Sequence, residues 1–387
     1  MPSPPPTSYS LSFDPVSLPE NHLDLRREVR DFLQEERSAG RFIAPRRSFR
    51  FSKEFSQSMG RMGYIGMTWP KEFHGHERSA LERYVVMEEL LAAGAPIGAH
   101  WVADRQSGPL LLRFGTDQQR QRFLPQIARG ECYFCIGMSE PDSGSDLASI
   151  RTSARRVDGG WKLNGTKLWT SWAHQAHFML ALVRTEPPSE NRHAGMSQMI
   201  IDMKSPGLSV RGVRNLAGDH DFNEEVFTDC FVPDEMVVGE VGNGWAQVIS
   251  ELAYERSGPE RFLLSFQVFV ELVRALGPHP SRHACEVLGR LAAHLTTLRN
   301  MSLSIAGMLE RGGLPNVESA IVKDLGTNLA KQVTEIARSL AQSEGCDGDE
   351  GFHDVLQEAI LYSPIHTIQG GTREILRGII AKELGLR

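Results

Sequence analysis

A polar loop in the first half of the chain combines residue types that suit a phosphate group or the polar edge of a flavin. The segment MSEPDSGSDLASIRTSA, Met138–Ala154, places Pro141, Gly144 and two serines directly after an apolar run. Proline and glycine favour a tight turn, which leaves backbone N–H and hydroxyl groups available to a ligand. An ordinary turn has the same composition, so the loop gains its specificity only from the segments around it.

Two carboxylates about two-thirds along the chain are candidates for a general base. Glu255 directly precedes Arg256 in the segment GWAQVISELAYERSGPER, and Glu251 lies four residues before Glu255. Residues four apart share one face of a helix, so Glu251 is the local alternative. Most Glu–Arg pairs on helices are solvated, and the pattern alone favours that interpretation.

Two clusters of metal-ligand residue types are better explained without a metal. Cys132-x-x-Cys135 has no second pair that would complete a zinc site, and its apolar neighbours indicate a buried strand. His74 and His76 flank a glycine in what we interpret as a surface loop. We therefore expect core cysteines and no metal site.

Residue patterns divide the chain into parts that must position these groups. Apolar residues recur at helical spacing in LDLRREVRDFLQEERSAG, and GTDQQRQRFLPQIARGE begins with a Thr or Asp cap. Short β-rich runs with turn signals such as Asn164-Gly165 come next, and long amphipathic stretches follow GEVGNGW. We predict an α+β multidomain protein, with a disordered lead-in at 1–16, a helical domain at 17–131, a β domain at 132–240 and a helical domain at 241–387.

The composition is that of an ordinary globular protein. Of 387 residues, 41% are hydrophobic and 23% are charged, and the net charge of −6 does not favour a nucleic-acid partner. No apolar run reaches the roughly 18 residues that a membrane helix needs. The N-terminal residues do not follow the basic-then-apolar order of a secretory signal, and five cysteines do not form a disulfide framework. We expect a reducing, cytoplasmic location.

Three segments resemble signatures of the acyl-CoA dehydrogenase family. MSEPDSGSDLASIRTSA is similar to TEPxAGSDxxxxxTxA, with Ser139 in place of threonine, and GGWKLNGTKLWTSWAHQAHFML resembles GxWxLNGxKxWITNxxxAxxxL. FNEEVFTDCFVPDEMVVGEVGNGW resembles the strand and VPxxxxxGxxGxGW crossover that precede the family's last domain. The resemblance covers nearly the whole chain and implies the acyl-CoA dehydrogenase fold, which has an N-terminal helical domain, a β-barrel-like middle domain and a C-terminal helix bundle.

The same resemblance implies a flavin-dependent oxidoreductase that forms an α,β double bond in an acyl thioester. The thioester would be an acyl-CoA or an acyl-carrier-protein conjugate, and an electron-transfer flavoprotein or similar acceptor would reoxidise the flavin. A homodimer or homotetramer is expected, and pairing with an unlike subunit stays open. FAD contacts are implied for Ile136, Met138, Ser139, Gly144, Ser145, Trp169, Ser171, Thr372 and Glu374.

The position of the base departs from the commonest family pattern. Many members carry glutamate before the second glycine of the C-terminal loop, where this chain has Gly370 in HTIQGGTREIL. Isovaleryl-CoA and long-chain dehydrogenases instead carry the base on the first long helix of the last domain, before an arginine. Glu255 matches that placement, so the resemblance implies that Glu255 is the base. Substrate contacts are then expected at Ser145, Tyr254, Arg256, Gly370 and Gly371.

Some family features are missing, and they keep two alternatives open. SRHACEVLGRLAAHL does not reproduce the RxxFG-like segment that reaches the FAD of a neighbouring subunit, and LAQSEGCDGDEGF does not reproduce QxxGGxG. One alternative is a flavin oxidase or monooxygenase on the same scaffold. The other is a non-catalytic partner subunit of a heteromeric acyl-CoA dehydrogenase.

Overall fold

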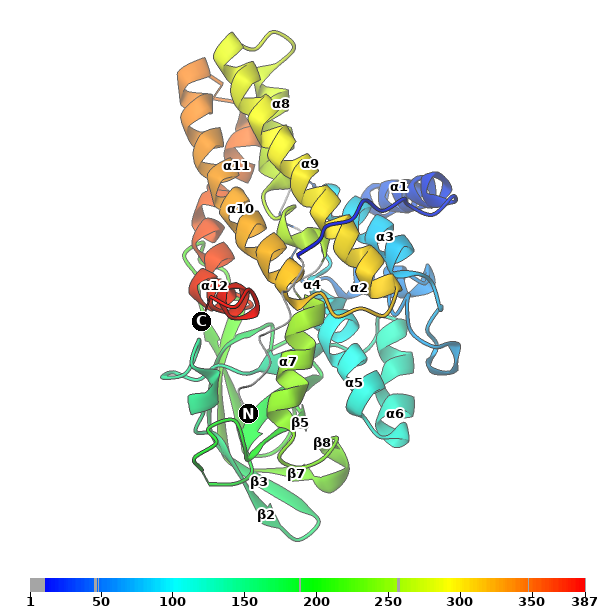
Figure 1. Cartoon of the computed structure of the whole chain (residues 1–387), viewed down its shortest axis with the longest axis vertical. Helices are drawn as coiled ribbons and strands as arrows, with labels where there is room; N and C mark the ends of the chain where they lie inside the picture. Colours follow the sequence, from blue (N-terminus) through cyan, green and yellow to red (C-terminus); the bar gives the residue numbers. More distant parts are fainter. Residues whose placement is uncertain are drawn as a thin grey trace, which may run out of the picture. The chain divides into compact units, whose positions relative to one another are not determined.

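The computed structural model describes residues 11–44, 47, 49–187, 189–255, 258–346 and 348–386, without the side chains of 252–255. These residues form two compact units, and each unit is built from separate stretches of the chain (Figure 1). One unit contains Arg50–Arg78 and Ile97–Tyr254 and is called the sheet unit below. The other contains the described residues of Met1–Phe49, Ser79–Pro96 and Glu255–Arg387 and is called the bundle unit.

The sheet unit is built around an eight-stranded sheet. Its strand order is β6-β7-β3-β2-β4-β5-β8, and β1 pairs in parallel with β4 off this path. Most neighbouring strands along the path are antiparallel, whereas β2 meets β4 in parallel at Ser153 and Arg184. The strands are β1 Phe134–Gly137, β2 Ser153–Val157, β3 Gly160–Ser171, β4 Phe178–Arg184, β5 Met196–Asp202, β6 Leu208–Val213, β7 Phe222–Pro233 and β8 Val237–Val238.

Helices of the same unit pack on this sheet and close its core. Val248 of α7 packs with Ile150, Leu182 and Met196, and Met138 lies against that cluster. Thr116 caps α6 through a capping box with Gln119, which decides between the two caps that the sequence offered. The helical elements are α2 Lys53–Arg61, η1 Lys71–Phe73, α4 Gly98–Val102, η2 Ala103–Ser107, α5 Gly108–Phe114, α6 Asp117–Ala128, η3 Leu147–Ser149, η4 Asp234–Met236 and α7 Gly244–Glu255.

The bundle unit is helical throughout its described elements. Two helices of 29 residues each, α9 and α10, run side by side, and α8, α11 and α12 pack against α10 (Figure 1). The elements are α1 His22–Ser38, α3 Ala80–Ala92, η5 Pro259–Arg261, α8 Phe266–Leu276, α9 Arg282–Glu310, α10 Asn316–Glu344, α11 Glu350–Tyr362, η6 Ser363–Thr367 and α12 Arg373–Glu383. Among the described helices of both units, none is long and apolar enough to cross a membrane.

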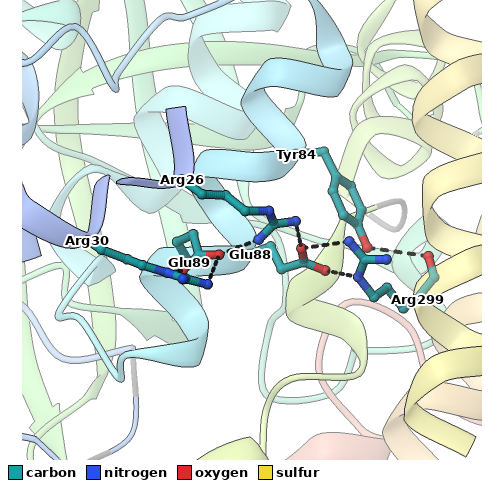
Figure 2. Close-up of polar contacts among 6 residues, drawn as sticks. All are labelled: Arg26, Arg30, Tyr84, Glu88, Glu89 and Arg299. Carbon is teal, nitrogen blue, oxygen red and sulfur yellow. Dashed lines mark hydrogen bonds and ion pairs between the residues drawn. The ribbon is translucent and has the colours of Figure 1, made fainter. Parts of the chain in front are cut away.

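Charged residues tie α1, α3 and α9 together inside the bundle unit (Figure 2). Glu88 of α3 accepts from Arg299 Nε at 2.6 Å and also pairs with Arg26 of α1. Glu89 accepts from Arg30 Nε at 2.7 Å and contacts Arg26 as well. Both glutamates are buried, so these pairs are less screened by water than surface pairs and hold three helices in register.

The structure describes only the end of the predicted lead-in, and its compact units do not correspond to the predicted domains. Residues 1–10 of the predicted lead-in lie outside the described residues. The domain limits at 131 and 240 stay a prediction, because each compact unit combines stretches that are separate in the sequence and neither unit begins or ends at these residues. Cys132 and Cys135 are buried, as expected from their apolar neighbours.

Candidate functional site

The polar loop begins where β1 ends, and β3 holds its first residues. The N–H of Leu168 in β3 donates to the Ser139 carbonyl at 2.9 Å. Ile136, Met138 and Ser139 are half-buried along this segment, and the Met138 side chain packs in the core. The structure therefore brings the start of the loop beside the strand that carries Trp169 and Ser171.

A buried ion pair that the motif analysis missed fixes the conformation of this loop. Lys167 Nζ donates to Glu140 Oε1 at 2.8 Å and to the Met138 carbonyl at 3.0 Å. The two oxygens of Glu140 also accept from the backbone N–H groups of Arg151 (2.6 Å) and Thr152 (3.0 Å). One carboxylate thus joins the beginning of the loop to its end, eleven residues later in the chain.

The protonation states of this pair follow from burial and mutual attraction. Burial acts to raise the pKa of Glu140, but the Lys167 charge and the backbone hydrogen bonds outweigh it and lower that pKa. Burial lowers the pKa of Lys167 to about 8, against the attraction of Glu140. A sequence signal existed: Lys167 continues the every-second-residue series of Trp161 and Leu163 that faces the interior.

Trp169 is held in an unusual position beside the loop. A register shift between β3 and β7 falls at Leu168 and Thr170, and Trp169 between them has φ 68°. This left-handed conformation is costly for a residue with a side chain, and such strain concentrates at functional positions. The indole is 57% exposed and meets only the edge of Phe222 among the described aromatic residues.

Thr170, which follows Trp169 in β3, forms a hydrogen bond with a second buried carboxylate that the motif analysis also missed. Thr170 Oγ1 donates to Glu225 Oε2 at 2.6 Å. Burial raises the pKa of Glu225 to about 7, and the Thr170 hydrogen bond only partly opposes this. The strand position next to the indole is therefore anchored by a group that titrates near neutral pH.

The residues around this strand fit a flavin in their chemistry. The hydroxyls of Ser139, Ser145 and Ser171 make no hydrogen bond with any other residue that the structure describes, so they are available as donors and acceptors. The exposed indole of Trp169 offers an apolar face of the kind that stacks on a planar ring. Gly144 is exposed, and a side chain there would meet no atom within 4 Å, so steric crowding within this chain does not explain the glycine.

The two candidate bases on α7 differ in how far the structure describes them. Glu251 is buried, and its Oε2 accepts from Gln198 Nε2 of β5 at 2.7 Å. Glu255 is the last residue of α7. The side chains of Tyr254 and Glu255, and all of Arg256, lie outside the described part of the chain, so their predicted roles stay predictions.

The C-terminal loop is pinned to α10 within the bundle unit. Lys323 is fully buried, and its Nζ donates to the carbonyls of Gln369 (2.6 Å), Gly370 and Gly371 (3.0 Å). Gly370 and Gly371 have φ values of 64° and 97°, which glycine adopts at little cost. Lys323 is a third residue that the sequence analysis did not single out.

Two other residues predicted to contact FAD follow this loop. Thr372 is the N-cap of α12, and its hydroxyl accepts from the Ile375 N–H at 3.4 Å. Glu374 is exposed in the first turn of the same helix. Apart from Tyr254, Glu255 and Arg256, the predicted site residues thus fall into two sets: those from Ile136 to Ser171 are in the sheet unit, and those from Gly370 to Glu374 are in the bundle unit.

No group of three or more histidine, cysteine or acidic side chains within the described ranges is arranged to hold a metal ion. Burial raises the pKa of the Cys132 thiol to about 12, so this cysteine is protonated at neutral pH.

Comparison with known proteins identifies relatives along the whole chain. Residues 19–131, 135–230 and 242–385 match the family models of the acyl-CoA dehydrogenase N-terminal, middle and C-terminal domains. Acyl-CoA dehydrogenase IpdE1 of Mycobacterium tuberculosis is 33% identical over 380 residues, which is 94% of this chain and 97% of that protein. Acyl-CoA dehydrogenase FadE34 of the same organism is 35% identical over 83% of this chain, which spans only 44% of FadE34's length. Among solved structures, the Tcur3481-Tcur3483 steroid ACAD is 26% identical with a TM-score of 0.82, and the match covers 97% of this chain and 99% of that one.

Proposed function

Because this chain belongs to the acyl-CoA dehydrogenase family of FAD-dependent oxidoreductases, we propose that it oxidises an acyl-CoA thioester at its α and β carbons with Glu255 as the base. The observation that carries this proposal is the frame around the polar loop. Lys167 and Glu140 fix the loop, and the strained, exposed Trp169 lies on the adjoining strand among free serine hydroxyls. Such a frame suits a planar, polar cofactor.

The reaction requires a base and hydrogen-bond donors that stabilise negative charge on the thioester carbonyl oxygen. The C–H bond next to the thioester carbonyl breaks, its proton passes to a carboxylate, and the electron pair moves toward the carbonyl oxygen. As a hydride leaves the next carbon, that electron pair forms the new C=C bond. Bound FAD supplies the acceptor for the hydride. The polar loop residues Ile136, Met138, Ser139, Gly144 and Ser145 would hold the flavin together with Trp169 and Ser171. Thr372 and Glu374 would contact its adenosine side.

The contacts of the other candidate carboxylates support the choice of Glu255 over its local alternative, Glu251. Glu251 is buried, and its Oε2 already accepts from the Gln198 amide, a contact that joins α7 to β5. Gly370 brings no carboxylate to the C-terminal loop, and the first acidic residue after it, Glu374, is exposed on α12. These observations support Glu255, the last residue of α7, as the base, and Tyr254 and Arg256, its neighbours in sequence, as substrate contacts.

We further propose that the acyl group is branched or bulky. A glycine at position 370 leaves space that a glutamate side chain would fill. The similarity to a protein described as a steroid ACAD supports a large, ring-containing acyl group. The name of that relative combines two proteins, Tcur3481 and Tcur3483, which supports pairing of this chain with an unlike subunit. An electron-transfer flavoprotein is the proposed electron acceptor.

The test is an anaerobic titration of the purified, flavin-loaded protein with acyl-CoAs, followed by the visible flavin spectrum. The panel contains straight-chain, 2-methyl-branched and ring-bearing thioesters. Bleaching by a bulky thioester is expected in the wild type and is expected to be lost in Glu255→Gln. Glu251→Gln is the matched control, because it changes the same residue type one helical turn away and should still bleach.

Three outcomes would count against the proposal in different ways. Bleaching that survives in Glu255→Gln would remove Glu255 as the base. A strict preference for straight chains would overturn the bulky acyl group. A flavin that no thioester bleaches, together with oxygen consumption, would favour an oxidase, and a pure protein without flavin would favour a non-catalytic partner subunit.

A further inference from the structure

Lys323 directs a buried ammonium group at three successive backbone carbonyls. Its Nζ lies 2.6 Å from the Gln369 oxygen and 3.0 Å from the Gly371 oxygen, and it also contacts the Gly370 oxygen. An ammonium group has three N–H donors and no acceptor, so these three carbonyls match its full donor set. The side chain is fully buried on α10, at the level of the loop that precedes α12.

This contact decides where the N–H groups of the loop point. In a trans peptide, the C=O and the N–H lie on opposite sides of the C–N bond. Since the Gln369 and Gly370 carbonyls face Lys323, the N–H groups of Gly370 and Gly371 face away from it. Neither N–H donates to any residue that the structure describes, so both are open to a ligand.

A second contact from the neighbouring residue of α10 holds the other end of the segment. Asp324 accepts from Arg373 Nε at 2.7 Å and lies 3.4 Å from Arg377 Nε, both in the first half of α12. The loop is therefore fixed by a cation that binds its carbonyls and by an anion that binds the following helix. Two glycines with positive φ allow the chain to follow this path.

We infer that Lys323 is a positioning residue for carbonyl polarisation, because it holds the Gln369–Gly371 peptides so that their outward N–H groups receive the thioester oxygen. This inference rests on the proposed function. When the proton next to the carbonyl leaves, negative charge develops on that oxygen, and fixed donors stabilise it more than mobile donors do. Lys323 itself does not touch the substrate.

The test uses full-length, flavin-loaded protein and compares Lys323→Met with Asp324→Asn. Methionine keeps much of the length of the lysine side chain but has no N–H donors, whereas the asparagine variant weakens the neighbouring anchor on α12. The probe is a carbonyl-¹³C acyl-CoA with sulfur in place of carbon 3, matched to the best substrate of the panel. It has no hydride to transfer from position 3, and isotope-edited infrared spectroscopy reports the hydrogen bonds to its carbonyl.

The wild type is expected to shift the bound carbonyl band to lower frequency than in buffer. Lys323→Met should lose most of that shift and lower kcat about 10²-fold, which is the effect of losing one oxyanion donor, with little change in KM. Asp324→Asn should keep most of the shift, because Asp324 binds arginine side chains of α12, whereas the loop carbonyls keep their contacts with Lys323. Lys323→Arg keeps the charge with a different donor geometry, so it should retain part of the shift even if Lys323→Met does not fold.

The outcomes separate this inference from the proposed function. A wild type that neither bleaches nor shifts the carbonyl band would overturn the proposed function and the inference together. A normal wild type with an unchanged band in Lys323→Met or Lys323→Arg would overturn the inference alone. Equal loss of the band shift in the Lys323 and Asp324 variants, in proportion to lost thermal stability, would also overturn it, because it would show a structural role only.

Discussion

Lys167 and Glu140 form a buried ion pair, with 2.8 Å between Nζ and Oε1, that joins the middle of β3 to the polar loop after β1. The lysine side chain is fully buried and that of the glutamate is 7% exposed. Removal of one partner of a buried pair leaves an uncompensated charge, which costs far more than the loss of a surface pair. The loop residues therefore depend on Lys167 for both their charge balance and their backbone path.

We predict that Lys167→Met lowers the free energy of unfolding by about 3 to 5 kcal/mol, because Glu140 keeps its charge without the ammonium group. The flavin should also be released more readily, since the loop loses its anchor at the Met138 carbonyl. Thermal denaturation and the flavin content after gel filtration measure the two effects.

Lys162→Met on the same strand is the matched control. Its ammonium lies 3.9 Å from the Asp229 carboxylate, and both side chains are well exposed. The free energy of unfolding should therefore change by no more than about 0.5 kcal/mol. Similar denaturation midpoints for the two variants would contradict the importance of the buried pair.

Glu225 gives a prediction about pH. Burial raises its pKa from 4.5 to about 7, so the folded protein binds this proton more tightly than the unfolded chain does. The resulting stability is fully present below pH 4.5 and is lost as pH rises toward about 7. The shift corresponds to roughly 3 kcal/mol at one pKa unit per 1.36 kcal/mol.

Glu225→Gln should remove this part of the pH dependence, because an amide resembles the protonated acid and can still accept from Thr170. The variant should become more stable relative to the wild type as pH increases from about 5 to 7.5. Urea denaturation at both pH values measures the difference. Glu224→Gln, on the neighbouring half-buried position, should lessen the slope only in part, because the Glu224 charge contributes to the raised pKa of Glu225 after burial itself. A wild-type slope that persists in Glu225→Gln would refute the assignment.

The family, its three-domain fold and its dependence on FAD, all predicted from the motifs, are confirmed by the comparisons. The motifs were sufficient to identify the family because each consists of residues close together in sequence, such as the loop after β1 and the strand with Trp169. The position of the base stays a prediction, since Glu255 is recognised by its place before Arg256 rather than by a described contact.

The residues that hold the site in shape could not be predicted in the same way. Lys167 and Glu140 are 27 residues apart, and Lys323 and Gln369 are 46 apart, so their contacts depend on the folded chain. A weak local signal existed for Lys323. It occupies the same helix face as Ser319 and Thr327, both buried and small, which leave room for a buried lysine beside them.

Glu88 offers a test of the bundle unit that is independent of the flavin. It pairs with Arg26 and Arg299, whose side chains are 14% and 35% exposed (Figure 2). Glu88→Gln removes the charge shared by two arginines from different helices, α1 and α9. We expect the free energy of unfolding of the bundle unit to fall by about 2 kcal/mol, which lies between the values for surface and buried ion pairs.

The loss of stability in Glu88→Gln should appear as faster amide hydrogen exchange in α1 and α9, while the sheet unit keeps its protection. Arg27→Gln breaks an exposed pair with Asp24 on α1 and should leave exchange unchanged. If α1 exchanges at the wild-type rate in Glu88→Gln, the apolar contacts of α1 rather than the ion pairs hold it on α3.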